Sequence, residues 1–227
     1  TGIWELGIPV GSYDNPNDPS TICQTDFQHT PGGYQCAFTG NSSSVTDGLG
    51  TNDVDGGHTT LLSPYYDLSN YNNPAFSYYR WYTNSPYSGA NPGADWWQVM
   101  ITDDGVNWHY IENNITSDAS WRQFAFRVTD YVNLTNSVQL KFIASDSIRV
   151  GQNLDGGSLV EAAVDDLILY ETQEVSSSIN DLEVLKPKLI RITGVLGKEI
   201  DPRNSVNNST LFYIYDDGSA QKKILIE

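Results

Sequence analysis

The sequence has little helical periodicity and no long apolar run. A membrane-spanning helix needs roughly 18 consecutive apolar residues, and no stretch of the chain approaches that length. No basic segment followed by an apolar one opens the chain, so no secretory signal peptide is recognisable at its start. The chain does contain 14 Tyr, 7 Phe and 6 Trp among its 227 residues. These large side chains can fill a hydrophobic core, so we expect a folded protein.

Basic residues are scarce in the first three quarters of the chain. Residues 1–175 contain 5 basic residues (Lys and Arg) and 21 acidic residues (Asp and Glu), whereas residues 176–227 contain 7 basic and 7 acidic residues. Every Trp lies in the first part. The acidic part lacks the basic footprint that phosphate binding requires, which argues against nucleic acid as a partner. Acidic side chains in loops rich in Gly and Asn suit hard cations, although acidity that serves only solubility is equally common.

Cysteine is almost absent, and the two that occur are Cys23 and Cys36. Their spacing fits neither a zinc ribbon nor a redox motif. A Pro-Gly-Gly turn lies between them, so they could form a disulfide, which would add about 3 kcal/mol in an oxidising compartment. We expect this bridge, and the alternative is two free buried thiols.

The residues that are present favour β-strands separated by clusters of Gly, Pro, Asn, Asp and Ser. Asp-Gly at 104–105 indicates a hairpin turn between two of these runs. Strands that follow one another without intervening helices predict an all-β, antiparallel sandwich. The runs with strand composition are 75–83, 95–102, 107–112, 121–128, 137–145 and 159–170.

A Ser-rich stretch separates this part from the C-terminal region. The predicted division is a large domain at 1–172, a linker at 173–186 and a small β unit at 187–227. The small unit contains three apolar runs, and Asp-Asp-Gly-Ser at 216–219 is the turn between the last two. A unit of about fifty residues with three strands is marginal alone, so it needs a partner surface or additional strands.

The C-terminal region resembles the type A sorting domain of proteins exported by the bacterial type IX secretion system. The resemblance rests on "VLGKE", the aromatic strand 211–215, the Asp-Asp-Gly turn and the last strand with its Lys pair. It implies an immunoglobulin-like signal that is recognised by the outer-membrane secretion machinery and is often removed afterwards. The early "YPNP"-type strand of the longer form is missing here. The positions that carry the signal are Val195, Leu196, Gly197, Lys198, Glu199, Tyr213, Tyr215, Asp217, Gly218, Lys222 and Lys223.

The large domain resembles the jelly-roll accessory domain, related to MAM and immune-inhibitor-A-type sandwiches, of secreted metallopeptidases. The segments that carry the resemblance include "GIWELGIPVGS", "HTPGGYQCAFTGN", "NDVDGGHTTLLSPYYDLSNYNNPAFSYYRWYTN", "DWWQVMITDDGVNW" and "GSLVEAAVDDLILY". The family's first strand usually precedes "TGIWE", so the domain's beginning lies outside this chain in our interpretation. The resemblance implies a jelly roll that supports a catalytic domain located upstream.

Two acidic clusters are candidate ligands for a structural Ca²⁺ ion. Asp53 and Asp55 alternate in a loop that ends in two glycines, and a strand pattern places Glu161 and Asp165 on one face and Asp166 on the other. One of the strand carboxylates should therefore point toward the core, where a Ca²⁺ ion would neutralise it. The predicted ligands are Asp53, Asp55, Glu161 and Asp165 or Asp166, with Asp26 a weaker candidate. The alternative is a solvated loop with Asp side chains that cap backbone groups.

No catalytic motif occurs in the sequence. Glu161 and Asp165 would be about 13 Å apart along one strand, farther than the roughly 5–10 Å between paired glycosidase carboxylates. The three His residues are scattered, and no zinc-protease, serine-hydrolase or Cys-His pattern is present. We therefore expect no enzyme activity in this chain.

Tryptophan raises carbohydrate binding as a second functional class. Trp96 and Trp97 are adjacent, so in a strand they face opposite sides, and one can be exposed near residues 84–93. The other candidates are Trp81, Trp108 and Trp121, most of which we expect in the core. The predicted function is a non-catalytic, calcium-stabilised module of a secreted or cell-surface protein, with a parent metallopeptidase. The alternative is a carbohydrate- or cell-surface-binding module.

Overall fold

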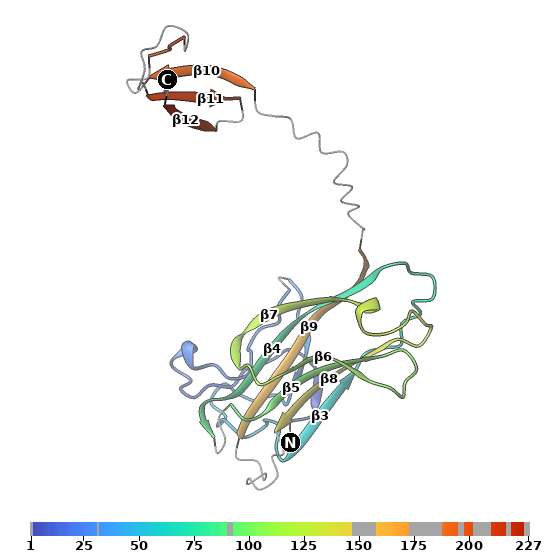
Figure 1. Cartoon of the computed structure of the whole chain (residues 1–227). Helices are drawn as coiled ribbons and strands as arrows, with labels where there is room; N and C mark the ends of the chain where they lie inside the picture. Colours follow the sequence, from blue (N-terminus) through green and yellow to red (C-terminus); the bar gives the residue numbers. More distant parts are fainter. Residues whose placement is uncertain are drawn as a thin grey trace. The chain divides into compact units, whose positions relative to one another are not determined.

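The structure is a computed structural model that describes residues 2–30, 32–89, 93–146, 158–172, 188–194, 198–201, 210–216 and 219–224. The chain divides into two compact units, Thr1–Glu174 and Val175–Glu227. Both units are built from antiparallel β-strands, and in the described residues only two short 3₁₀ helices, Pro19–Thr21 and Val128–Asp130, interrupt them (Figure 1). The all-β, antiparallel prediction is therefore confirmed. No described helix is long and apolar enough to span a membrane.

The large unit contains two sheets that pack face to face as a β-sandwich. The five-stranded sheet has the order β1-β2-β9-β4-β7, and the four-stranded sheet has the order β3-β8-β5-β6. Strands that are consecutive in sequence repeatedly cross between the sheets, as in a jelly roll. The strand bounds are Trp4–Gly7 (β1), Cys36–Thr39 (β2), Gly57–Leu62 (β3), Pro74–Gly89 (β4), Trp96–Thr102 (β5), His109–Asn114 (β6), Asp118–Arg127 (β7), Gln139–Asp146 (β8) and Ser158–Glu171 (β9).

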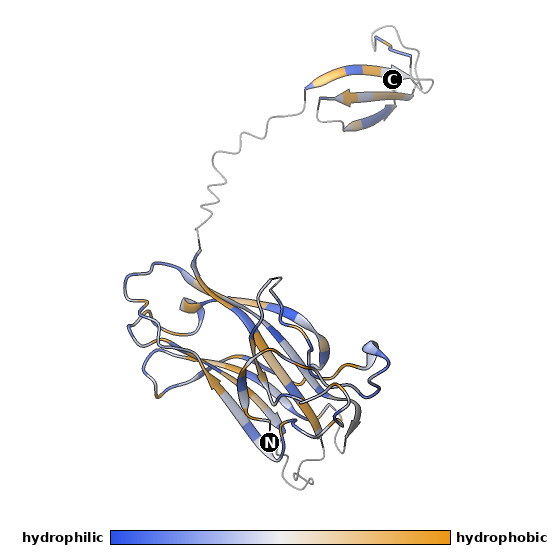
Figure 2. Ribbon diagram, turned by 180° about the vertical axis from the view of Figure 1, so that it is seen from behind, coloured by the Kyte–Doolittle hydropathy of each residue, from blue (hydrophilic) through white to orange (hydrophobic). Residues whose placement is uncertain are grey.

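The core lies between the two sheets and follows the period-two alternation of the strands. In β8, Leu140, Phe142 and Ala144 are fully buried, whereas Lys141 and Ile143 on the other face are half-buried. The same alternation appears as orange and blue segments along the strands in Figure 2. β4 and β5 contribute the fully buried rings of Tyr82 and Trp97 to this core. The run 137–145, predicted as a strand, is confirmed as β8.

A buried ionic network crosses the core. Glu112 of β6 is buried and accepts hydrogen bonds from Tyr78 Oη at 2.6 Å and Trp97 Nε1 at 3.0 Å. Its other oxygen accepts from Arg80 Nε at 2.9 Å. Both carboxylate oxygens of Glu112 therefore have partners, which makes a buried carboxylate tolerable.

A long N-terminal segment, residues 8–30, adds a further layer to the outer face of the five-stranded sheet. Ile22 and Trp121 pack against a second cluster of buried side chains formed by Cys36, Phe38, Trp81 and Ala163. Trp81 Nε1 donates to the carbonyl of Cys23 at 2.7 Å, which ties the segment to β4. Part of the five-stranded sheet is thus covered on both faces.

The small unit contains one described three-stranded sheet. Its order is β10-β11-β12, with bounds Leu189–Gly194, Thr210–Tyr215 and Ala220–Ile224. Leu211 in the central strand is buried. The three strands correspond to the predicted runs, whereas a complete immunoglobulin-like sandwich stays a prediction. The predicted linker at 173–186 lies outside the described residues.

Candidate functional site

Asp53 lies in a loop that is held close to the beginning of β1 and the end of β2. Gly40 has a φ of 51°, and a Cβ at this position would lie 1.9 Å from the carbonyl oxygen of Asn52. Gly2 has a φ of 66°, and its Cβ would lie 2.4 Å from the carbonyl oxygen of Asp53. Only glycine permits both close approaches. Val54 N donates to Val160 O at 3.0 Å, so the loop also pairs with β9.

Asp53 and Glu161 form a pair of buried carboxylates. Asp53 is 1% exposed and its Oδ1 has no hydrogen-bond partner, while Glu161 is 5% exposed. Burial, together with the charge of Asp55, raises the pKa of Asp53 to about 7. Burial and the charge of Asp53 raise the pKa of Glu161 well above its usual range. The raised pKa of both carboxyls means that the protein alone compensates their negative charges poorly.

The hydrogen-bond partners of Glu161 are uncharged side chains. Glu161 Oε2 accepts from Gln24 Nε2 at 2.9 Å and from Thr39 Oγ1 at 3.2 Å. Both donors are buried, and Gln24 Nε2 also donates to the Thr39 carbonyl at 2.8 Å. The site is therefore a buried environment rich in oxygen atoms, which are the ligands that Ca²⁺ prefers.

The remaining predicted ligands on β9 lie elsewhere. Asp165 Oδ2 accepts from the backbone N of His29 at 2.9 Å, and Asp166 Oδ2 lies 2.7 Å from His29 Nδ1. Thr30 Oγ1 also donates to Asp166. Neither carboxylate points toward the core, contrary to the strand pattern. The reason is a β-bulge in β9, where Asp166 has a φ of 51° and the register against β4 shifts.

Asp26 and Asp55 complete the predicted set. Asp26 is exposed and accepts from Tyr13 Oη at 2.6 Å, and Asp55 is exposed. Within the described residues, no three or more His, Cys, Asp or Glu side chains come together as a metal site. The structure thus brings together Asp53 and Glu161 of the predicted ligands. A cation there would need carbonyl, amide or water oxygens as its further ligands, and Gln24 and Thr39 provide such atoms nearby.

Cys23 and Cys36 are both buried free thiols, so the expected disulfide is not formed in the structure. Burial raises the pKa of each thiol to about 12, with Glu161 the next cause for Cys23 and Asp165 for Cys36. These two carboxylates are four residues apart on β9. The carbonyl of Cys23 accepts a hydrogen bond from Thr83, which pairs with Glu161, whereas Ala37 beside Cys36 pairs with Val164. The two cysteines therefore lie at different places along β9, which the sequence spacing could not show.

The Trp residues divide between the core and two surfaces. Trp97 is fully buried and Trp96 is half-buried on the opposite side of β5, so the predicted alternation is confirmed. Trp81 is buried, whereas Trp108 and Trp121 are half-buried. Trp96 lies in the four-stranded sheet and Trp108 beside it, next to Lys141, whereas Trp121 belongs to the five-stranded sheet.

An aromatic pocket of about 390 Å³ lies over the outer face of the five-stranded sheet. We use "aromatic pocket" for the cavity lined by Tyr13, Pro19, Ile22, Asp26, Phe27, His29, Trp81, Ala119, Ser120 and Trp121. Its size is within the range of small-molecule sites. The Trp81 ring meets those of Phe27 and Trp121 edge to face, with centroids 6.2 and 6.1 Å apart.

Hydrogen bonds fix the rings of this pocket. Trp121 Nε1 donates to the Phe27 carbonyl at 3.2 Å. The His29 ring stacks on Tyr79 with centroids 3.4 Å apart and is held by Asp166. Ligand binding would therefore require little ordering of the pocket, which favours affinity. No sequence pattern indicated this pocket, because its walls come from segments about 40 to 100 residues apart.

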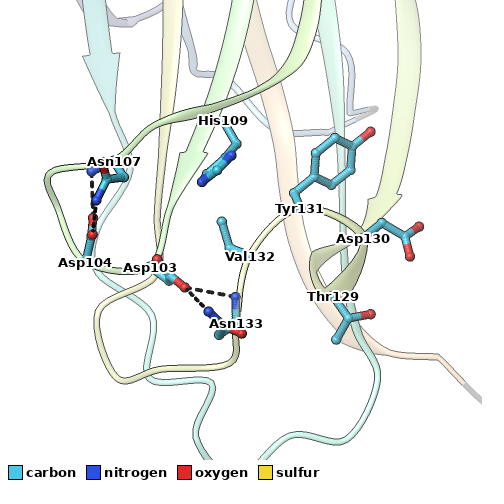
Figure 3. Close-up of a pocket in the computed structure, with 9 residues that line it drawn as sticks. All are labelled: Asp103, Asp104, Asn107, His109, Thr129, Asp130, Tyr131, Val132 and Asn133. Atoms are coloured by element: carbon cyan, nitrogen blue, oxygen red, sulfur yellow. Dashed lines mark hydrogen bonds between the residues drawn. The ribbon is translucent and has the colours of Figure 1, made fainter.

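A second, polar pocket of about 470 Å³ lies among loops at one end of the sandwich (Figure 3). Asp103 Oδ2 accepts from N and Nδ2 of Asn133, at 2.9 and 3.0 Å. Asp104 accepts from the backbone N of Val106 and Asn107, and these bonds lower the pKa of its carboxyl. Both carboxylates are thus engaged in fixing loops, and no Trp lines this pocket.

The predicted sorting-signal residues are only partly within the described residues. Val195, Leu196, Gly197, Asp217 and Gly218 lie outside them. Lys222 and Lys223 are exposed on β12, and Lys223 Nζ lies 4.4 Å above the Tyr213 ring. Glu199 forms an isolated bridge to Thr193. These contacts describe the unit and do not test the recognition of a signal.

No protein-family model and no curated protein matches the chain. Among solved structures, TmCBM61 in complex with β-1,4-galactotriose is 10% identical, covers 74% of this chain and 88% of its own, and has a TM-score of 0.34. Family 16 Carbohydrate Binding Module-2 is 10% identical over 63% of this chain and 80% of its own, with a TM-score of 0.30.

A third similar structure holds the CBM22-1 and GH10 modules of Clostridium thermocellum xylanase 10B with xylohexaose. It is 12% identical over 64% of this chain, has a TM-score of 0.32, and is matched over 23% of its length. These three structures contain carbohydrate-binding modules by their names. TM-scores this low assign neither a function nor a ligand to the chain.

Proposed function

We propose that the large unit is a non-catalytic carbohydrate-binding module whose ligand occupies the aromatic pocket. The observation that carries this proposal is the half-buried indole of Trp121, fixed by its bond to the Phe27 carbonyl in a cavity of about 390 Å³. A sugar ring has an apolar face of C–H groups, which packs on an aromatic ring, and hydroxyl groups at its edge. Asp26 and Ser120 in the same wall are suitable partners for those hydroxyls.

Tryptophan fluorescence titration with neutral oligosaccharides of several backbone types tests this function. We expect at least one class to bind the wild-type chain, and Trp121→Ala to weaken binding about fivefold, because aromatic stacking contributes about 1 kcal/mol. Tyr34→Ala is the control, since Tyr34 is 75% exposed and does not line the pocket. Binding that is unchanged in Trp121→Ala, or no response to any class, would refute the proposal.

We also propose that Asp53 and Glu161 hold a structural Ca²⁺ ion. The support is the unpartnered Oδ1 of a carboxylate that is almost fully buried, beside a second buried carboxylate. The ion would supply positive charge to this carboxylate pair, and it would join the loop of Asp53 to β9. Asp165 and Asp166 bond to His29 and Thr30 and are not part of this proposed site.

A second candidate function, as an export signal, concerns residues 175–227. We propose that this unit directs secretion through the type IX machinery, so that the protein is located outside the outer membrane. Its division from the large unit and the exposed Lys222 and Lys223 on β12 support this proposal. β12 pairs only with β11 among the described strands, and such an edge can pair with another protein. The parent metallopeptidase stays a prediction.

Fusion of residues 175–227 to a reporter protein in a bacterium with type IX secretion tests the export proposal. We expect the reporter in the medium or on the cell surface. A fusion that lacks residues 220–227 is the control and should stay inside the outer membrane. Equal export of both fusions, or of neither, would contradict the proposal.

A further inference from the structure

The outer face of the four-stranded sheet is a second surface with the chemistry of a binding site. We use "outer face" for the residues of this sheet that point away from the core. They are His58, Thr60, Leu62, Trp96, Gln98, Met100, Tyr110, Asn113, Lys141, Ile143 and Ser145, together with Trp108 just before β6. Leu62 and Tyr110 are 51% and 49% exposed, and the central residues are half-buried.

The strand register places these side chains in rows across the sheet. Met100 pairs with Lys141 on one side and with Tyr110 on the other. Gln98 lies in the next row and its Nε2 donates to Asn113 Oδ1 at 2.9 Å. Aromatic rings therefore alternate with amide groups on one surface. Such a surface can pack on sugar rings and bond to their hydroxyl groups.

The described carboxylates of these four strands lie on the inward side. Glu112 and Asp146 are buried, as is Asp95 directly before β5. Asp95 and Asp146 share the parity of the core residues of their strands, and Glu112 pairs with the buried Val99. None of the outward positions carries an Asp or Glu, although residues 1–175 contain 21 of them. The local charge of the outer face is thus opposite to that of the whole chain.

Lys141 is the cation of this face. Among the described residues of the large unit, Arg80, Arg122 and Arg127 pair with carboxylates, whereas Lys141 makes no ion pair. Its Nζ lies 3.7 Å above the ring of Trp108, which positions the ammonium group without neutralising its charge. A half-buried, positioned ammonium group on a surface without acids is complementary to an anion.

We propose that the outer face binds a polysaccharide chain that contains uronic acid residues. Lys141 pairs with a uronate carboxylate, and Tyr110 and Trp96 on β6 and β5 provide packing surfaces for other sugar rings of the chain. Tyr110 is two strands away from Lys141, about 10 Å, so neighbouring sugars of one chain contact both residues. A nucleic acid is a poorer fit, because closely spaced phosphates require several cations and the described outer face has one. The site is separate from the aromatic pocket and does not depend on it.

The test is calorimetric titration of the full chain with short galacturonate oligosaccharides and with the same oligosaccharides after methyl esterification. Esterification removes the charge and keeps the sugar chain, so we expect about a tenfold or greater loss of affinity. Lys141→Gln should cause a similar loss with the acidic ligand, and Lys141→Arg should restore most of the binding. A chemically sulfated neutral oligosaccharide distinguishes a uronate site from a general anion site.

The outcomes separate this proposal from that of the aromatic pocket. Trp121→Ala should bind the galacturonate oligosaccharides as the wild type does, even if it loses neutral sugars. No binding of the acidic oligosaccharides, equal binding of the acidic and esterified forms, or tighter binding of the sulfated ligand would overturn the proposal. The ester comparison uses the wild-type chain, so it remains decisive if a Lys141 variant folds poorly.

Discussion

Substitution of Asp53 by Asn tests the buried carboxylate pair and its cation together. In the cation-free protein, the folded-state pKa of Asp53 is about 7, against an ordinary value of 3.8. Between these pH values the folded state keeps a proton that the unfolded state has lost. The free energy of unfolding therefore falls as pH rises from about 4 to about 7. A pKa difference of about three corresponds to no more than about 4 kcal/mol.

The Asp53→Asn variant carries an amide that cannot titrate, so its free energy of unfolding does not fall with rising pH for this reason. With a chelator at about pH 8, we expect the variant to be more stable than the wild type, by up to about 4 kcal/mol, whereas near pH 4 the two should be similar. With Ca²⁺ at about a hundred times its dissociation constant, the wild type gains about 2.7 kcal/mol. The variant should gain little, because it has lost a ligand. Calcium is thus expected to reduce or reverse the difference in the free energy of unfolding between the variant and the wild type.

Urea unfolding, followed by Trp fluorescence, measures these differences at about pH 4 and about pH 8, with either chelator or millimolar Ca²⁺. Asp14→Asn is the control, since Asp14 is exposed and the chemical change is the same. Equal responses of wild type and Asp53→Asn to Ca²⁺ would exclude a site at Asp53. A variant that is less stable than the wild type in chelator at the higher pH would show that the buried carboxylate is compensated by the protein itself.

Three further predictions concern the core, the thiols and the two units. Glu112→Ala should destabilise the large unit by about 3–5 kcal/mol in urea unfolding, because it leaves Arg80 without its buried partner; a cost below about 1 kcal/mol would contradict the network. Cys23 and Cys36 should resist iodoacetamide at about pH 8 in the native chain and react after unfolding, whereas a mass lower by two hydrogens would reveal a disulfide. A chain that ends at Glu174 should keep the melting temperature of the large unit, and a clear decrease would show that the units stabilise each other.

The strands were predictable because each one carries a local signal. Alternation in 137–145, the Asp-Gly turn at 104–105 and the aromatic runs place β8, β5 and β6 correctly to within a few residues. Side-chain direction could be predicted only where the register stays regular. Trp96 and Trp97 follow the alternation, but the bulge at Asp166 reverses the expected direction of one carboxylate. Nothing local in "AVDDLIL" marks that bulge.

A candidate site could be predicted where a single residue type, such as a carboxylate in an apolar strand, indicates its chemistry. A carboxylate on an apolar strand face is recognisable from sequence as a candidate metal ligand, and Asp53 and Glu161 do come together. The aromatic pocket could not be predicted, since Trp121 gains its role from Phe27 and His29, which are distant in sequence. The two thiols show that a favourable sequence spacing is not sufficient to predict a contact. Their separation of 13 residues permits a bridge, but β2 and the N-terminal segment 8–30 place them at different points along β9.

The distribution of acidic groups changes what the net charge of −16 implies about partners. Part of the acidity lies in exposed loops, where Asp18, Asp47 and Asp67 accept hydrogen bonds from nearby Ser residues, which lowers the pKa of each carboxyl. Another part is buried. Neither part occupies the outer face of the four-stranded sheet. The cation that a ligand on this face contacts is Lys141, and repulsion from carboxylates more than about 10 Å away is largely screened by physiological salt. The net charge therefore argues against binding of a densely charged polyanion such as nucleic acid. It does not argue against a sugar chain of which one carboxylate at a time contacts Lys141.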